Sequence, residues 1–290
     1  MLAPLLLAVG VGAALLRVRA ARRAERAYAD RRPPNVDGIV SGAEGFTLAG
    51  STGRALLMLH GFGDTPQTLR YLGGRLHAAG FTVHAPLLPG HGRGLRDFAA
   101  ASAEDYASSA RDELAWLRAR APWVGVIGLS MGGAIAARLA AEADDIRVLA
   151  LLAPYLTPPR TVALVARAAP LWSVVVPYLG GRTGDSSVHD PVARASSFAY
   201  GIFPPRAVQA LCATAAAGRR ALPSVTVPTL VVNSREDNRI PLALAETATA
   251  SLAGPTERQW VTGCGHVITV DYCRDVVANL VLDFLARHAD

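Results

Sequence analysis

Ser130 is the residue whose neighbours in the sequence most clearly suggest chemistry. It stands in the run Gly128-Leu129-Ser130-Met131-Gly132, after a β-branched apolar stretch and before alanine, isoleucine and leucine at helical spacing. This pattern predicts a strand, a sharp turn and a helix, with the serine at the turn. The glycines let the two backbones pack closely while the serine takes a strained conformation and projects its Oγ. The run therefore predicts a nucleophile elbow; the alternative is a glycine-rich turn whose serine only caps the helix.

His266 is the expected partner of that serine. A serine hydroxyl becomes nucleophilic when an imidazole takes its proton, and the imidazole needs a carboxylate to fix its tautomer. In folds with this elbow, the chain order is serine, carboxylate, histidine. His266 follows the last expected strand, in a glycine-containing loop that can carry the imidazole to the edge of the sheet. The other histidines lie before Ser130, in an expected insertion or at the C-terminus: His60, His77, His84, His91, His189 and His288.

Asp237 is the expected carboxylate. It follows a strand that ends near Asn233, and open α/β sheets place site residues in loops just past the carboxyl ends of their strands. Glu236 is a local rival, and Asp271 is a weaker one because it follows the histidine in the chain. The alternative for Asp237 is an ordinary polar residue of a surface loop.

Two backbone amides are expected to stabilise the negative charge that forms on a carbonyl oxygen under attack. One is the N–H of Met131, next to the nucleophile at the positive end of its helix. The other is the N–H of Phe62, in the run His60-Gly61-Phe62-Gly63 after the first long apolar strand. We expect His60 to brace this loop rather than to act as a base.

Strand-like and helix-like stretches alternate along most of the chain, which predicts an α/β fold with a mostly parallel central sheet and helices on both faces. The 290 residues, 51% of them hydrophobic, suit a single core with an inserted cap. The expected strands cover residues 55–60, 81–86, 124–129, 147–153, 227–233 and 257–261. One expected helix ends near residue 79, a second follows Ser130, and two more cover residues 103–120 and 273–287.

Residues 154–223 interrupt this alternation and are expected to form the cap. The insertion follows a strand whose carboxyl end lies beside the elbow, so it should cover the active site. It contains an apolar run over 161–179, broken by Pro170 and Pro177. Apolar side chains there can pack on the core, line an acyl-chain tunnel or form a membrane-facing lid. Those that suit any of these roles are Val165, Leu171, Trp172, Val175 and Tyr178.

Residues 1–32 form a hydrophobic segment with a basic flank. Residues 2–16 are uncharged and rich in leucine and alanine, and arginines follow at once. The run is shorter than the roughly 20 residues of a spanning helix, but arginine side chains can extend its reach. We expect residues 2–19 to associate with the cell membrane, with the catalytic domain on the cytoplasmic side. The alternatives are an atypical export signal, a mis-assigned start codon and a cytoplasmic protein.

Proline positions, charge and cysteine content indicate where the catalytic domain begins and which partners and cofactors it lacks. Two prolines within residues 31–35 should end the N-terminal helix, and the catalytic domain is expected to span 38–290. The net charge is +6, of which seven arginines and two acidic residues between Arg17 and Arg32 contribute +5, so a nucleic-acid surface is not expected. The three cysteines show no metal-ligand spacing and are too few for a disulfide framework, so we expect a reducing compartment and no metal or cofactor.

Several motifs, taken together, suggest a family. They are HGFG at 60–63, PGHG at 89–92, GLSMGG at 128–133, SREDNRIP at 234–241 and GHVITVD at 265–271, with IVSGAE at 39–44. In this combination and order, the chain resembles bacterial monoacylglycerol lipases and the similar carboxylesterases of the α/β-hydrolase superfamily. The resemblance implies an α/β-hydrolase fold, a triad of Ser130, Asp237 and His266, oxyanion donors at Phe62 and Met131, and a small cap over an acyl pocket.

The predicted activity is hydrolysis of carboxylic esters of acyl chains, of the carboxylesterase or monoacylglycerol lipase type, through an acyl-enzyme on Ser130. The expected partner is a small-molecule acyl ester or a monoacylglycerol, with no nucleic acid. A thioesterase or a lysophospholipase is the alternative within enzymes. A catalytically silent binding module of the same fold is the alternative from another class, and the complete set of five site positions argues against it. The resemblance does not extend to the cap sequence or to residues 1–32.

Overall fold

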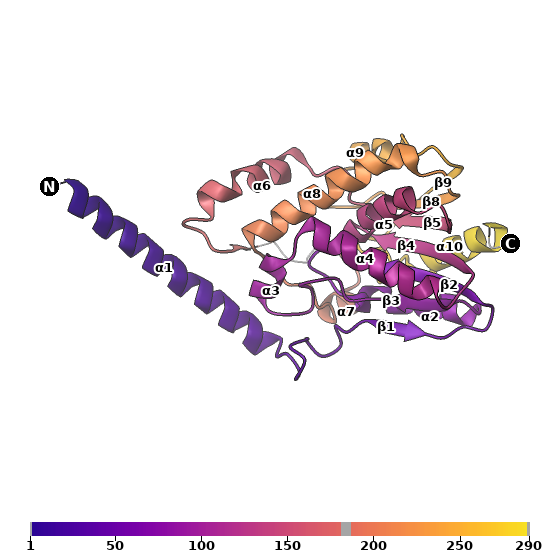
Figure 1. The fold of residues 1–290 in the computed structure, drawn as a ribbon, viewed down its shortest axis with the longest axis horizontal. Helices are drawn as coiled ribbons and strands as arrows, with labels where there is room; N and C mark the ends of the chain where they lie inside the picture. Colours follow the sequence, from indigo (N-terminus) through magenta and orange to yellow (C-terminus); the bar gives the residue numbers. More distant parts are fainter. Residues whose placement is uncertain (1, 181–186, 289–290) are drawn as a thin grey trace.

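A seven-stranded sheet lies at the centre of the computed structural model, which describes residues 2–180 and 187–288, with side chains from residue 11 onward (Figure 1). From one edge to the other, its strands are β1 (Phe46–Leu48), β3 (Thr82–Ala85), β2 (Arg54–Leu59), β4 (Trp123–Leu129), β5 (Ile146–Leu152), β8 (Thr229–Ser234) and β9 (Thr256–Val261). Neighbouring strands are parallel except β1, which runs antiparallel to β3. The expected α/β fold with a mostly parallel sheet is therefore confirmed.

The central strands are apolar and end together. Every residue of β4 is buried, as expected for a parallel strand that helices cover on both faces. Leu59 at the end of β2 pairs with Gly128, and Leu129 at the end of β4 pairs with Leu152 of β5. The carboxyl ends of these strands therefore form one edge, and the loops with the predicted site residues leave from it.

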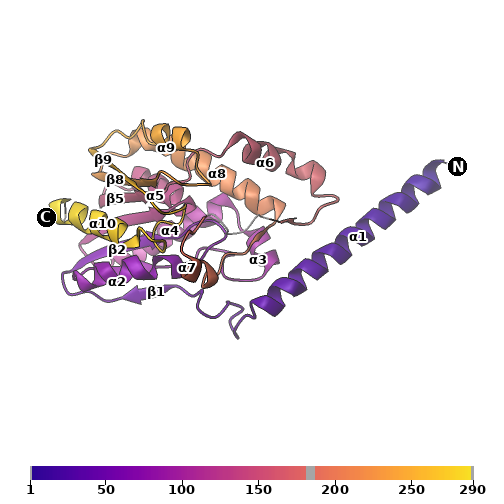
Figure 2. The ribbon, with the colours of Figure 1, turned by 180° about the vertical axis from the view of Figure 1, so that it is seen from behind.

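Helices cover both faces of this sheet (Figures 1 and 2). They include α2 (Arg70–Ala78), α4 (Ala103–Arg118), α5 (Met131–Glu142), α8 (Pro205–Ala221) and α10 (Arg274–His288), with the short α9 (Leu242–Ala248) between β8 and β9. Side chains alternate along a strand, so Leu56 and Met58 of β2 face one side and Leu57 and Leu59 the other. The first pair belongs to the core under α2 and α10, and the second to the core under α4, α5 and α8.

The expected cap region contains two parts with different packing. Its elements are α6 (Arg160–Trp172), β6 (Leu179–Gly180), α7 (Pro191–Ala195), β7 (Ile202–Phe203) and α8, and residues 181–186 lie outside the described residues. α8 packs directly on α5, since a Cβ on Gly218 would overlap Ala134. The part before α8 reaches the edge of the sheet, where the Tyr200 N–H donates to Gly63 O and the Val267 N–H donates to Ser187 O.

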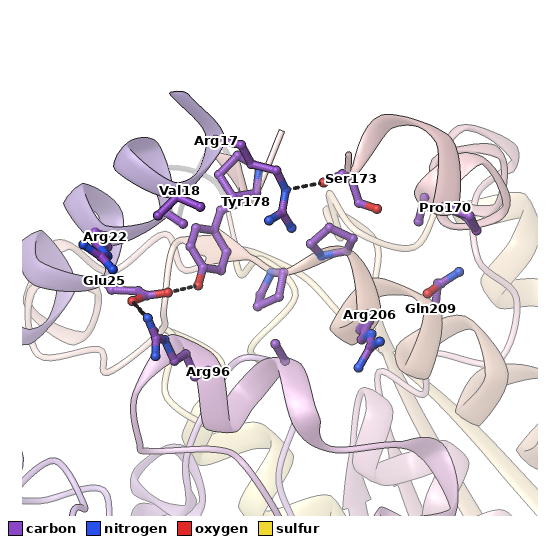
Figure 3. Close-up of a pocket in the computed structure, with 16 residues that line it drawn as sticks. Arg17, Val18, Arg22, Glu25, Arg96, Pro170, Ser173, Tyr178, Arg206 and Gln209 are labelled. Carbon is purple, nitrogen blue, oxygen red and sulfur yellow. Dashed lines mark hydrogen bonds and ion pairs between the residues drawn. The ribbon is translucent and has the colours of Figure 1, made fainter. Parts of the chain in front are cut away.

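The N-terminal helix α1 (Leu2–Arg31) extends away from the domain at its start and contacts it in its second half (Figures 1 and 2). Tyr28 is 3% exposed and stacks on Tyr200 with ring centroids 4.9 Å apart. Glu25 pairs with Arg96 on α3 (Leu95–Ala100) and accepts a hydrogen bond from the Tyr178 hydroxyl (Figure 3). The second half of α1 is therefore part of the folded body.

The boundary of this segment agrees with the sequence, but its membrane prediction has no support in the structure. The helix ends at Arg31, before the two prolines, as the sequence predicts. Within the described residues, no helix combines the length and the apolar character needed to cross a bilayer. A spanning anchor therefore has no support in the structure.

The other expected elements agree with the structure to within two residues at each end that was given. The sequence does not predict β1, nor the short elements α3, β6, α7, β7 and α9. A strand of three residues is too short to show a hydrophobic period, and β1 exists because it pairs with the edge of β3.

Candidate active site

Ser130 lies at the sharp turn between β4 and α5. Its backbone has φ 54° and ψ −116°, a strained conformation for a residue with a side chain. Hydrogen bonds on both sides hold it there: its N–H donates to Leu152 O at 2.9 Å, and its carbonyl accepts from Gly133 N and Tyr155 N. The neighbouring strand and the helix thus fix the direction in which the serine Oγ projects.

Two glycines make this turn possible. A Cβ on Gly128 would overlap the backbone of Gly132, and a Cβ on Gly132 would overlap the Leu59 carbonyl at the end of β2. Any side chain at either position would push the start of α5 away from the sheet. The glycine–serine–glycine spacing is therefore a packing requirement of the turn.

The side chains of Ser130, His266 and Asp237 meet at the carboxyl edge of the sheet. The Ser130 Oγ and the His266 Nε2 are 2.8 Å apart, and the His266 Nδ1 lies 2.7 Å from the Asp237 Oδ2. Ser130 is 8% exposed and His266 is 7% exposed, so little water reaches the contacts. The three residues come from the loops after β4, β8 and β9, which the strand order places near one another.

Asp237 is held as a carboxylate in a fixed orientation. Its Oδ1 accepts the backbone N–H of Arg239 at 2.7 Å and of Ile240 at 2.9 Å, while Oδ2 faces His266. Burial opposes ionisation of this group, but the electrostatic interaction with the His266 imidazole and these hydrogen bonds outweigh it and hold the pKa of Asp237 below its usual value. An ionised carboxylate can only accept, so the His266 Nδ1 carries the proton and Nε2 is free to accept from the Ser130 hydroxyl.

Glu236, the local rival, serves a different contact. Its carboxylate accepts the Gly263 N–H at 2.8 Å and so links the loop after β8 to the loop of His266. Among the described residues, the His266 Nδ1 hydrogen-bonds Asp237 and not Glu236.

The two predicted oxyanion donors occupy suitable parts of the fold. Met131 is the first residue of α5, so its N–H has no partner within the helix. In the part of the chain that the structure describes, no backbone carbonyl accepts the Phe62 N–H. A Cβ on Gly61 would lie 3.3 Å from the Ser130 Cβ, which places the Phe62 loop directly against the nucleophile.

His60 braces the Phe62 loop, as expected. Its Nε2 accepts the Leu88 N–H at 3.1 Å, so Nδ1 carries the proton and donates to Gly61 O at 2.9 Å. Burial and the neighbouring His91 keep the pKa of His60 well below its usual value. A neutral, fully buried imidazole therefore fixes the peptide group that carries the Phe62 N–H.

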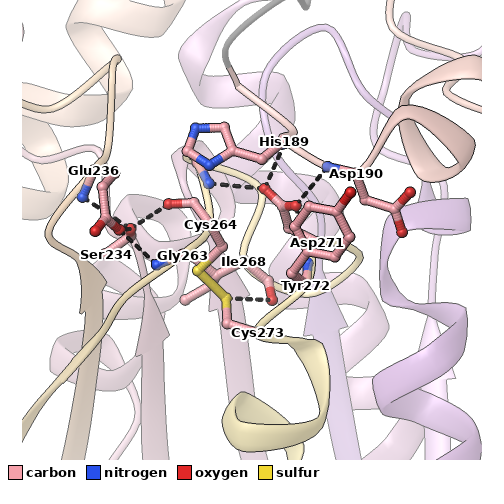
Figure 4. Close-up of a disulfide and its surroundings, with 11 residues drawn as sticks. His189, Asp190, Ser234, Glu236, Gly263, Cys264, Ile268, Asp271, Tyr272 and Cys273 are labelled. Carbon is pink, nitrogen blue, oxygen red and sulfur yellow. Dashed lines mark hydrogen bonds between the residues drawn. A yellow bond between two sulfur atoms is a disulfide. The ribbon is translucent and has the colours of Figure 1, made fainter.

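A disulfide closes the loop that carries His266, which corrects the expectation that the cysteines are reduced (Figure 4). Cys264 and Cys273 are bonded, both are almost completely buried, and they bracket the histidine. The expectation was wrong because two cysteines nine positions apart are adjacent only after β9 ends and α10 turns back over the sheet. Cys212 is a free thiol on α8.

Asp271 is the residue of this region whose role the sequence did not reveal. It is completely buried, and its carboxylate accepts four backbone N–H groups at 2.7 to 2.9 Å. Burial opposes its ionisation, but these donors outweigh burial and lower the pKa of Asp271. The donors are Gly265 and Tyr272, in and after the His266 loop, and His189 and Asp190 of the cap segment (Figure 4). The Asp271 carboxylate therefore joins the His266 loop to the cap segment.

No group of three or more histidine, cysteine or acidic side chains suited to a metal ion occurs among the described residues. The site as described consists of side chains and backbone amides that could carry out acyl transfer on their own.

Comparisons with known proteins agree with this geometry. Residues 56–280 match the model of the alpha/beta hydrolase family, a range that includes the elbow and the loops of Asp237 and His266. The chain belongs to this family. A thermostable monoacylglycerol lipase of Bacillus sp. (strain H-257) is 29% identical over 253 residues, which cover 87% of this chain and 97% of that protein. A carboxylesterase of Bacillus subtilis (strain 168) is 25% identical over 244 residues, which cover 83% and 96%.

Among solved structures, one reported under "LipS and LipT, two metagenome-derived lipolytic enzymes" is similar with a TM-score of 0.78 and 27% identity. The structural alignment covers 86% of this chain and 100% of the chain in that structure. The chain is thus a hydrolase of the lipase and esterase type. The coverage starts after α1, so the N-terminal helix has no counterpart in the family match.

Proposed function

We propose that the protein is a serine hydrolase that cleaves carboxylic esters of acyl chains through an acyl-enzyme on Ser130. The observation that carries the proposal is the continuous contact from Ser130 Oγ to His266 and on to Asp237, at 2.8 and 2.7 Å. The family match and the two Bacillus relatives support the same reaction class.

In the proposed reaction, the Ser130 Oγ attacks the ester carbonyl while its proton moves to the His266 Nε2. The negative charge on the carbonyl oxygen is stabilised by the N–H groups of Phe62 and Met131. As the tetrahedral intermediate collapses, the imidazolium gives its proton to the alcohol oxygen, and the acyl group stays on the serine. Water then attacks the acyl-serine, loses its proton to the same Nε2, and releases the carboxylic acid and the serine hydroxyl. The Asp237 carboxylate keeps the imidazole in the required tautomer throughout.

The proposed substrate class is a small acyl ester such as a monoacylglycerol. This proposal is supported by the two Bacillus relatives, a monoacylglycerol lipase and a carboxylesterase, which are similar to this chain over 97% and 96% of their lengths. Phe203 of β7, in the cap segment, stacks on Phe62 with ring centroids 5.5 Å apart, so this part of the chain lies beside the proposed ester site. This stacking places an aromatic wall of the cap beside one proposed oxyanion donor.

The test is hydrolysis of p-nitrophenyl butyrate and of a monoacylglycerol by the purified full chain. We expect Ser130→Ala to lower kcat by about 10⁶-fold and Asp237→Asn by about 10⁴-fold, with little change in KM, since both act on the chemical step. Glu236→Gln is the matched control, because it changes a neighbouring carboxylate that contacts Gly263 and not His266. Turnover of Ser130→Ala at the wild-type rate would contradict the proposal.

A substrate panel separates the proposal from the thioesterase and lysophospholipase alternatives. The purified enzyme is given a monoacylglycerol, a lysophospholipid and an acyl-CoA of equal chain length, and kcat/KM is compared. We expect the monoacylglycerol to give the highest value. A higher value for the thioester or the lysophospholipid would reassign the substrate while leaving the serine mechanism intact.

A further inference from the structure

A cleft between α1 and the cap gathers basic side chains, and its lining contains none of the three triad residues (Figure 3). Its volume is about 650 Å³. Arg17 and Arg22 come from α1, Arg96 from α3 and Arg206 from the first turn of α8, while Glu25 is the single acidic side chain in the lining. Four positive charges against one negative charge leave a net charge of +3, which favours an anionic ligand.

Glu25 compensates Arg96 directly and Arg22 at longer range, so the remaining positive charge of the cleft is not neutralised by any acidic side chain in the lining. Glu25 is already engaged with Arg96 at 2.9 Å, and the Arg17 Nε donates to the carbonyl of Ser173 at 2.7 Å. Among the described residues, Arg22 and Arg206 form neither a hydrogen bond nor an ion pair. In Figure 3, Arg22 lies on the α1 side of the cleft and Arg206 on the α8 side, so both walls present a guanidinium group to an anion in the cleft.

The mouth of this cleft is apolar. It continues into a second hollow of about 460 Å³, lined by Ala13, Ala14 and Val174 together with Arg17, Val18 and Ser173, which both hollows share. Large apolar side chains next to this mouth are exposed to an unusual degree: Leu15 54%, Leu16 66%, Leu171 80%, Val174 66% and Val175 63%. Leu171 and Val175, considered for an acyl tunnel in the sequence, therefore point outward from the cap.

We propose that this cleft and its apolar mouth dock the protein on an anionic phospholipid surface. A guanidinium group binds phosphate oxygens through paired hydrogen bonds, so Arg22 and Arg206 would bind lipid phosphates that enter the cleft. The exposed side chains of α1 and of residues 171–175 would enter the boundary between headgroups and acyl chains. A soluble anion would explain the arginines but would leave the adjoining apolar surface uncovered. The helix lies on the membrane in this arrangement and does not cross it.

This docking concerns a surface outside the proposed triad, so it can be tested without catalysis. Full-length Ser130→Ala protein is sedimented with vesicles of phosphatidylcholine, with or without phosphatidylglycerol. We expect tight binding only to the vesicles that contain phosphatidylglycerol, and weaker binding as salt is added. Equal binding to both kinds of vesicle, or to neither, would overturn the proposal.

Paired variants locate the surface. Each arginine near an anionic surface contributes about fivefold to binding, so Arg22→Gln with Arg206→Gln should weaken binding by about 25-fold. The matched control is Arg219→Gln with Arg220→Gln, at the other end of α8 and about 20 Å from Arg206. We expect the control pair to bind like the parent protein. Equal losses in both pairs would mean that general positive charge, and not the cleft, attracts the vesicles.

The apolar mouth has a test of its own. Leu171→Ser with Val175→Ser should weaken vesicle binding by about tenfold or more, because exposed side chains that enter the lipid are lost. An unchanged thermal unfolding midpoint verifies that the variant is folded. If this variant instead converts a dimer into a monomer and binds vesicles like its parent, the apolar surface covers a second copy of the chain and the lipid proposal is wrong.

Discussion

Replacing Asp64 by asparagine should make the protein more stable at pH 8 and leave its stability unchanged at pH 4. Asp64 lies in the loop after β2 and is 8% exposed. Its Oδ2 accepts the Thr68 hydroxyl at 2.8 Å, but within the described residues its buried Oδ1 has no hydrogen-bond partner. Burial is the dominant effect and raises the pKa of this carboxyl from 3.8 to about 6, against smaller opposing contributions from Thr68, Thr65 and His266.

The size of the expected gain in unfolding free energy follows from the raised pKa of Asp64. The folded state binds the Asp64 proton more tightly than the unfolded chain, so the free energy of unfolding falls as the pH rises from about 4 to about 6. At about 1.36 kcal/mol for each pH unit, the loss amounts to about 3 kcal/mol above pH 6 and is absent below pH 4. Asparagine keeps an acceptor for Thr68 and carries no charge, so Asp64→Asn removes the loss.

The assay is urea unfolding of wild type and Asp64→Asn at pH 4 and pH 8. Asp112→Asn, a change at an exposed position on α4, is the control and should alter stability equally at both pH values. The reasoning is refuted if Asp64→Asn is less stable than wild type at pH 8, or if its gain is the same at the two pH values.

Two further predictions concern the loop of His266. Asp271→Asn should lower the free energy of unfolding at pH 7 by about 3 kcal/mol, because an amide group cannot accept four N–H donors. Since the folded pKa of Asp271 is lowered, its stabilisation is complete above about pH 4 and is lost below, so urea unfolding at pH 3 should show a smaller difference; an equal difference at both pH values argues against an ionised carboxylate. Reduction of the Cys264–Cys273 bond should lower the unfolding free energy by about 2 to 3 kcal/mol, as measured by urea unfolding with and without a reductant. The double variant Cys264→Ser, Cys273→Ser should not respond to the reductant, and a response there would assign the effect to another group.

The elbow could be predicted from the sequence because its requirements are local. Gly128 and Gly132 are needed for packing at the turn itself, and a β-branched strand precedes it. The chain order of the site loops then limited the histidine to His266 and placed the carboxylate in the loop after β8. These residues lie together in the structure as the order predicts, and their catalytic roles remain predictions.

The disulfide, the contacts of Asp271 and the packing of α1 could not be predicted, because they depend on contacts between distant segments that no local pattern encodes. The disulfide needs the turn between β9 and α10, and the four donors to Asp271 come partly from the cap, about 80 positions away. Tyr28 lies among arginines in an N-terminal stretch and gives no sign that it stacks on Tyr200. The only sequence signal for the contact between the His266 loop and the cap is Asp271 itself, five residues after His266, and its position in the chain argues only against a triad role.

The most direct test of the central claim is covalent labelling of the full-length protein with a fluorophosphonate, followed by mass spectrometry of its peptides. If Ser130 is activated by His266, the phosphonyl group should appear on the peptide that contains Ser130, at near-complete occupancy. It should be absent from Ser130→Ala and much reduced in His266→Ala. Labelling of another serine, or equal labelling of Ser130 when His266 is replaced, would contradict the proposed triad.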